Sequence, residues 1–108
     1  GDFVTPAAIE RNRGLKDAVA EYTNVDLKQI LVCNWSKDNS LRKVPMILNR
    51  YPGIVAIWAA NDPIALGAME AVVELGKKPG QDIFLGGLNW DSPALKKIQE
   101  GTLTIVFW

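Results

Sequence analysis

The sequence contains no histidine and a single cysteine, Cys33. Without histidine it lacks the commonest metal ligand and general base, and one cysteine cannot form an internal disulfide or a cysteine-based zinc site. Histidine-dependent catalytic triads and zinc hydrolases are therefore excluded for these 108 residues. Cys33 ends an apolar run, where a small buried hydrophobe is expected rather than a nucleophile.

An excess of one charge sign and long apolar runs are also missing. Lysine plus arginine number 12 and aspartate plus glutamate number 12, so the formal net charge is zero. This balance provides no electrostatic footprint for nucleic acid or for an anionic membrane. No apolar segment approaches the roughly 20 residues that span a bilayer, and the first residues do not resemble a secretory signal. We expect no nucleic-acid partner and no direct membrane insertion.

Apolar residues make up 48% of the chain, which is enough to form a core. The pattern predicts helices over 5–22, about 40–50, 62–76 and 92–101, and strands over 29–33, 54–59, 82–88 and 102–108. This alternation predicts an α/β fold of three layers, with a mostly parallel sheet and helices on both faces. Because the chain opens on a helix and closes on a strand, we expect residues 1–108 to be a fragment of such a domain.

Helix starts are indicated by polar residues placed just before prolines. Thr5 and Ser92 are expected to cap the first and last helices, and Asp62 is expected to cap the third. Pro45 lies inside the second helical pattern, so that helix should begin late or be kinked. Arg11 falls on the apolar face of the first helix, where a cation is desolvated unless it finds partners.

Three apolar runs end on an asparagine, namely Asn34, Asn61 and Asn89. Ligands of open parallel sheets bind in the crevice beyond the carboxyl ends of the strands. An amide there can donate to and accept from hydroxyl groups, which favours an uncharged, polyhydroxylated ligand. Turn and cap chemistry could also explain these residues. Asn61 and Asn89 hold matched positions on neighbouring strands, whereas Asn34 reads better as a turn residue.

Two tryptophans and an arginine join these amides as candidates. Trp35 and Trp90 each follow a strand end, where an aromatic face could stack on a sugar ring, although core packing is the alternative. Arg11 could direct its five fixed donors to ligand hydroxyls. By contrast, Arg13 should be solvated and Trp58 should belong to the core. The role of Trp108 stays open at this point.

Other chemistries find little support. The Gly86-Gly87 pair lacks the glycine spacing of a dinucleotide or Walker loop. No carboxylate pair suited to glycoside hydrolysis can be located, because Asp62 and Asp91 both read as caps. A flavodoxin-like enzyme or signalling domain would need a nucleophile, a phosphate loop or an acidic cluster at the strand ends, and none is found. We therefore expect neither catalysis nor a cofactor nor a bound metal.

Three segments resemble the C-terminal lobe of type I periplasmic sugar-binding proteins, the ribose-binding-protein-like components of ABC importers. They are Arg11-Asn-Arg-Gly-Leu15, the stretch from Pro52 to Met69 containing Asn61-Asp-Pro-Ile-Ala-Leu-Gly67, and Gly87-Leu-Asn-Trp-Asp91 with the residues that follow it. The effector domains of the lactose-repressor family share this layout. The resemblance covers nearly the whole chain.

The resemblance implies roles for individual residues. Arg11 and Asn61 would bind sugar hydroxyls, Asp62 beside Asn61 would also contact the ligand, and Trp35 would stack on the ring. Asn89 departs from the family pattern, because relatives usually carry an aspartate there. An amide at this position loses a charge-assisted acceptor and gains a donor, which leaves the identity of the ligand open.

The resemblance also implies a two-lobe protein that closes on its ligand like a hinge. Residues 1–108 would be part of the C-terminal lobe, without the N-terminal lobe, the first strand and the final helices. The full protein would be periplasmic or extracytoplasmic and would deliver a sugar to a membrane permease. The alternative is the effector-binding domain of a repressor, which a helix-turn-helix upstream of Gly1 would reveal.

Overall fold

The computed structural model describes residues 1–107; Trp108 and its place in the last predicted strand lie outside them. Four helices and three strands follow one another along the chain. They are α1 (Pro6–Ala20), α2 (Lys37–Arg50), β1 (Ala56–Trp58), α3 (Asp62–Glu74), β2 (Phe84–Leu88), α4 (Ser92–Gln99) and β3 (Ile105–Phe107). No helix among the described residues is both long and apolar enough to cross a membrane.

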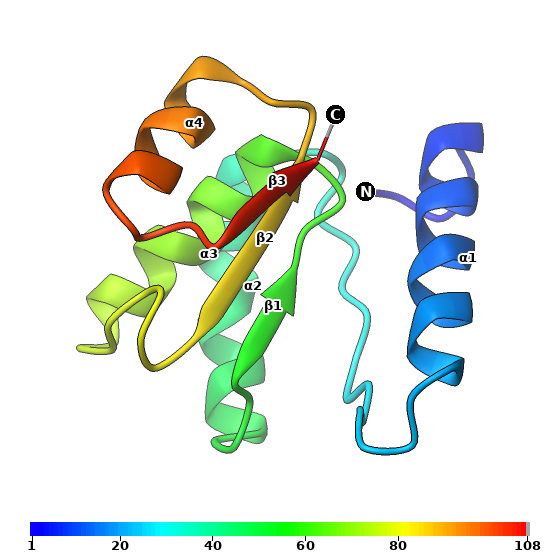
Figure 1. Cartoon of the computed structure of the whole chain (residues 1–108), viewed down its shortest axis with the longest axis horizontal. Coiled ribbons are helices and arrows are strands. Elements are labelled where there is room, and N and C mark those ends of the chain that lie inside the picture. Colours follow the sequence, from blue (N-terminus) through cyan, green and yellow to red (C-terminus); the bar gives the residue numbers. More distant parts are fainter. Residues whose placement is uncertain (108) are drawn as a thin grey trace.

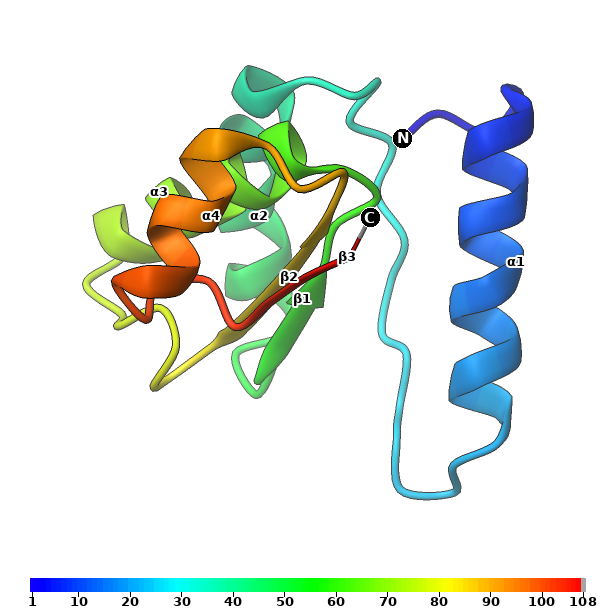
Figure 2. The same ribbon diagram turned by 45° about the horizontal axis from the view of Figure 1, so that its top comes forward.

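The three strands form one parallel sheet in the order β1-β2-β3. Ala56 aligns with Phe84 in the first pair, and Gly86 aligns with Ile105 in the second. In Figure 2, α2, α3 and α4 lie on one side of this sheet and α1 stands on the opposite side. The predicted α/β class with a parallel sheet is confirmed.

The core lies between the sheet and the α2–α3 pair. Its most buried large side chains include Val72 of α3, Ile83 and Leu85 at β2, and Leu103 before β3. Cys33 is also buried, at 3% exposure, as predicted. By contrast, α1 contributes only Ala8 to the buried residues. The helix that carries Arg11 therefore contributes fewer buried residues than α2 and α3.

Helices α2 and α3 approach each other closely at Gly67. A Cβ atom there would lie 2.2 Å from the carbonyl oxygen of Lys37 and 2.9 Å from the Cβ of Ser40. Ser40 is fully buried, and its hydroxyl donates to the carbonyl of Ile64 at 2.8 Å. Glycine is therefore required at this crossing because any side chain would meet backbone.

The predicted strand over 29–33 does not form. The segment is extended and runs alongside the sheet (Figure 1), but it pairs with no strand of the described chain. Its end is tied instead to the N-terminus, because the amides of Cys33 and Asn34 donate to the carbonyl of Gly1 at 3.1 Å each. The apolar pattern identified a strand, but a strand needs a neighbour with which to pair.

A hollow of about 590 Å³ separates this segment from β1. Its walls are α1, the extended residues 24–33, the inner face of α2 and residues 53–60. Val25, Leu27 and Val55, which line it, are 48%, 39% and 63% exposed. Large apolar side chains are thus left open along two neighbouring extended segments.

Several predicted helix boundaries shift by a few residues. Asn61, not Asp62, caps α3, because its side-chain oxygen accepts from the amide of Ile64 at 3.0 Å. Asp91 takes the cap position of α4, so Ser92 is the first helical residue. The second helix begins earlier than predicted, because Ser36 caps it by accepting from Asn39, and it runs on through Pro45.

Candidate functional site

The side chain of Arg11 reaches from α1 to the carboxyl ends of the strands. One terminal nitrogen, Nη1, donates to the carbonyl of Ala60, just after β1, at 2.5 Å. The other, Nη2, donates to Oδ1 of Asn89, just after β2, at 3.2 Å. Arg13, two residues on, is exposed, as predicted, and pairs with Glu10. Arg11 therefore joins two strand ends that are distant in the sequence.

Trp35 lies beside Arg11, with the guanidinium carbon 5.5 Å from the centroid of its ring. The indole nitrogen donates to Oδ2 of Asp2 at 2.8 Å, which fixes the ring. Both Asn34 and Trp35 have positive φ, at 47° and 61°, so the chain turns sharply here. This confirms Asn34 as a turn residue and places an aromatic ring next to the arginine, in the range of a cation–π contact.

Asp2 was not identified from the sequence. Its carboxylate accepts from the amides of Thr5 and Val4 as well as from Trp35. The hydrogen bond from the Thr5 amide, followed by those from Val4 and Trp35, holds the pKa of Asp2 well below its usual range. The spacing Asp-x-x-Thr before Pro6 is the available signal, since it is typical of an aspartate that caps a turn.

Asn61 is 6% exposed and its amide is largely engaged within the protein. Its oxygen caps α3, and its nitrogen donates to the carbonyl of Trp35 at 3.3 Å. The side chain therefore ties the start of α3 to the turn that carries Trp35. One amide hydrogen is not used in these bonds, and this donor is what Asn61 can offer a ligand.

Asp62, the next candidate, is fully buried. Its Oδ2 accepts from the amide of Asp91 at 2.7 Å, so the carboxyl lies beneath the loop that follows β2. Burial raises the pKa of Asp62 despite this hydrogen bond, and the nearby carboxylate of Asp91 acts in the same direction. Asp62 thus lies beneath the surface of the candidate site and is not exposed on it.

The loop after β2 carries the last two candidates, Asn89 and Trp90. Asn89 is exposed and has a φ of 130°, and Trp90 is 52% exposed with a φ of 67°. Positive φ is rare for residues other than glycine and costs on the order of 1–3 kcal/mol each. The amide of Asn89 donates to the carbonyl of Phe107 at 2.8 Å, which anchors the loop to β3. Backbone strain at this place is typical of functional loops.

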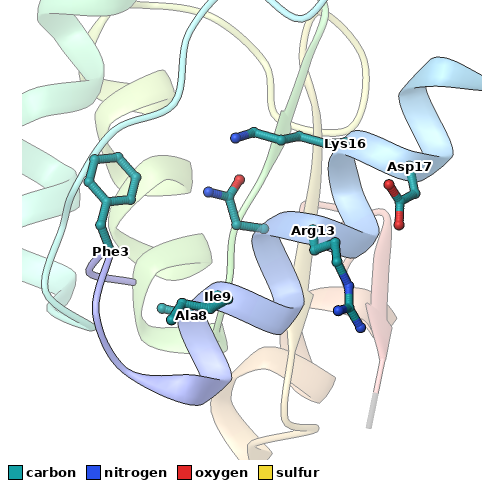
Figure 3. A pocket seen from close by; sticks show the side chains of 7 residues that line it. Phe3, Ala8, Ile9, Arg13, Lys16 and Asp17 are labelled. Carbon is teal, nitrogen blue, oxygen red and sulfur yellow. The ribbon is translucent and has the colours of Figure 1, made fainter.

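A second, smaller hollow of about 290 Å³ lies against α1 (Figure 3). Phe3 lies on one side of it and Ala8 and Ile9 of α1 lie on another, while Arg13 and Asp17 point away from Phe3. None of the predicted site residues lines this hollow. It is therefore not the candidate site.

The structure brings Arg11, Trp35, Asn61 and Asn89 together at one edge of the sheet. This edge offers a cationic fork, two amides and an aromatic ring, and no nucleophile paired with a base. Such a wall can hold hydroxyl-bearing molecules by hydrogen bonds and by stacking. The described side chains provide no group of three or more residues suited to a metal ion.

The chain matches a known protein family over its whole length. The profile of the periplasmic binding protein domain matches residues 1–108. The chain is 31% identical over 107 residues to the HTH-type transcriptional regulator AscG of Escherichia coli, covering 92% of this chain and 32% of AscG. It is also 31% identical over 100 residues to the ribose import binding protein RbsB of Salmonella typhimurium, with the same shares of both chains.

A solved structure agrees closely in shape. The crystal structure of a periplasmic sugar-binding protein from Pseudomonas fluorescens superposes with a TM-score of 0.94 at 42% identity, over 98% of this chain and 32% of that one. The chain thus spans about one third of the length of the relatives it matches. With its sequence profile and its fold in agreement, this chain belongs to the periplasmic binding protein family.

Proposed function

We propose that this chain forms part of one wall of a sugar-binding cleft in a solute-binding protein of an ABC importer. The observation that carries the proposal is the convergence of Arg11 with Asn89 and Trp35 at the carboxyl ends of the strands. In this proposal Arg11, Asn61 and Asn89 bind ligand hydroxyls, and Trp35 and Trp90 contact the sugar ring. The names of RbsB and of the Pseudomonas fluorescens protein support a sugar as the ligand.

The proposal includes the domain organisation. Residues 1–108 would be part of the C-terminal lobe of a two-lobe protein, with the N-terminal lobe supplying the opposite wall. The relatives, about three times as long, support this reading. So does the hollow beside β1, where a further strand of the same lobe could pair with both 27–31 and 55–59.

Localisation and partners follow from the same proposal. Proteins of this family related to the chain include periplasmic ones, so the full protein would work in the periplasm or outside the cytoplasmic membrane. It would deliver its sugar to a membrane permease. The proposal assigns no catalytic step to any residue.

One alternative has a specific observation in its favour. AscG, a transcriptional regulator, is as similar in sequence as RbsB, so the chain could belong to the effector-binding domain of a repressor. The two proposals share the sugar site and differ in what precedes the lobes. A signal peptide upstream would support the transporter, and a helix-turn-helix would support the repressor.

The direct test is calorimetry on the full two-lobe protein. D-Ribose, D-allose, D-galactose and myo-inositol would be titrated separately into the wild type and into Asn89→Ala. The proposal expects at least one of them to bind and expects the variant to weaken that binding. Absence of binding by every compound, with the protein folded, would contradict a sugar-binding function of this kind.

A further inference from the structure

Asp62 occupies a place that a ligand cannot reach. The residue is 0% exposed, and one carboxyl oxygen, Oδ2, accepts from the amide of Asp91 at 2.7 Å. The other, Oδ1, is buried and has no hydrogen-bond partner within the described chain. The whole carboxyl is therefore enclosed between the start of α3 and the loop after β2.

The other side of the carboxyl is closed by Gly87. A Cβ atom on Gly87 would lie 2.4 Å from Oδ1 of Asp62, and 3.1 Å from the Cβ of Ala65. Only glycine leaves room for the carboxyl at this point of β2. The missing side chain at Gly87 of β2 thus leaves the space that the carboxyl of Asp62, the first residue of α3, occupies.

The loop held by Asp62 is the one that presents Asn89. It passes through two positive-φ residues, Asn89 and Trp90, without a glycine. Such a path persists only where surrounding contacts impose it. Phe107 binds the loop at the Asn89 amide, and Asp62 binds it at the Asp91 amide. Between these two anchors, Oδ1 of Asn89 faces Arg11 at 3.2 Å.

We propose that Asp62 is a positioning residue of the binding site, which acts on the ligand only through the conformation it imposes on the 88–91 loop and hence on Asn89. This inference rests on the proposed sugar-binding function. It replaces the direct contact expected for Asp62 from the sequence with an indirect one. It also explains why residue 87 is glycine. From the sequence, we could say only that the Gly86-Gly87 pair lacks the spacing of a phosphate-binding loop.

The test uses the full two-lobe protein with three variants. Asp62→Ala removes the acceptor, Gly87→Ala displaces the carboxyl from below, and Asp62→Asn keeps an oxygen that can accept from the Asp91 amide. The matched control is Asp82→Ala, because Oδ2 of Asp82 also accepts a backbone amide, that of Lys78, at 2.7 Å in a turn away from the site.

The first readout does not involve a ligand. Amide hydrogen exchange at Asn89 and Asp91 should accelerate at least about 10-fold in Asp62→Ala and in Gly87→Ala, because their restraint is lost. It should be near wild type in Asp62→Asn and in the control. Unchanged exchange in both disruptive variants would overturn the proposal, whether or not the protein binds a sugar.

The second readout is a double-mutant cycle of Asp62→Ala with Asn89→Ala, measured by calorimetry with the compound of the panel above that the wild type binds best. If Asp62 acts through Asn89, its replacement should weaken binding about 10-fold in the wild type but have little effect when Asn89 is already alanine. Additive losses would indicate a direct or independent role and would overturn the proposal. Failure of the wild type to bind any compound would refute the proposed function, leaving the exchange experiment to decide the role of Asp62.

Discussion

Arg11 is the residue on which the candidate site depends most. Its guanidinium contacts the strand ends of both β1 and β2 and lies over Trp35. The flat five-donor fork allows these contacts at once, which a lysine ammonium could not reproduce. The residue also brings a positive charge close to the side-chain oxygen of Asn89.

We predict that Arg11→Ala in the full two-lobe protein weakens sugar binding about 10- to 100-fold, since hydrogen bonds to charged groups contribute roughly 1.5–3 kcal/mol. Arg11→Lys should recover only part of this loss. Arg13→Ala is the matched control, because its side chain is 66% exposed and pairs with Glu10 of the same helix. Calorimetry would measure all three, and equal affinities for wild type and Arg11→Ala would contradict the role of Arg11.

A pH dependence follows from Asp62. Because burial raises its pKa above the 3.8 of an unperturbed aspartate, the folded state holds this proton more tightly than the unfolded chain does. The contribution of Asp62 to the free energy of unfolding is therefore greatest below about pH 3.8. This contribution is lost as the pH rises through the higher pKa of the folded state.

Asp62→Asn cannot titrate, so its stability relative to wild type should increase as pH rises from about 3 to about 8. Urea denaturation at each pH measures this difference. Asp2→Asn should show the opposite trend, because hydrogen bonds lower the pKa of Asp2. Parallel curves for Asp62→Asn and wild type over the whole range would show that the pKa of Asp62 is not raised.

At the scale of the elements, most helices and strands could be predicted from spacing and caps. The parallel strands β1, β2 and β3 lie within the predicted ranges, and the fold class is confirmed. The segment 29–33 is the instructive exception, because its apolar pattern is that of a strand and its backbone is extended. Pattern alone does not reveal whether a neighbouring strand is present to accept its hydrogen bonds.

The α2–α3 crossing provides a stability prediction. Gly67→Ala should lower the free energy of unfolding by about 1–3 kcal/mol, because the added methyl would collide with the backbone of α2. Gly14→Ala is the matched control, as it also lies within a helix but has open space around its Cβ position. It should raise stability by about 0.5–1 kcal/mol. Urea denaturation distinguishes them, and equal effects would refute the tight crossing.

At the scale of the whole molecule, two features stand out: the candidate site residues at one edge of the sheet, and a hollow lined by exposed apolar side chains beside β1. The site residues converge at one edge of the sheet, while the hollow beside β1 leaves Val25, Leu27 and Val55 exposed. Exposed apolar groups beside an open edge of extended backbone are typical of a surface that another segment covers. Both features agree with a chain about one third as long as its relatives.

We therefore predict that residues 1–108 alone bind sugar weakly or not at all, because half of the enclosing contacts would come from the opposite lobe. Calorimetry should give no measurable heat at sugar concentrations that saturate the full two-lobe protein. The full protein, titrated in parallel, is the control for active ligand. Tight binding by residues 1–108 would contradict the divided cleft.

The amino-acid sequence alone was enough to predict the class of fold, the order of most elements and a set of candidate residues for the site. These follow from local rules, namely apolar periodicity, capping residues and the position of polar side chains at strand ends. Trp35 and Asn89 could be found in this way because the carboxyl ends of parallel strands meet at one edge, and Arg11 could be found because it is a cation on the apolar face of the first helix.

The contacts that each candidate residue makes came only from the folded chain. Asn61 proved to be the cap of α3, Asp62 was enclosed under the 88–91 loop, and Asp2 proved to hold Trp35. The last two of these assignments depend on which donors face which acceptors across long sequence separations, 33 residues for Asp2 and Trp35 and 29 residues for Asp62 and Asp91. Burial and hydrogen-bond partners are properties of the folded chain, so no local pattern could have supplied them.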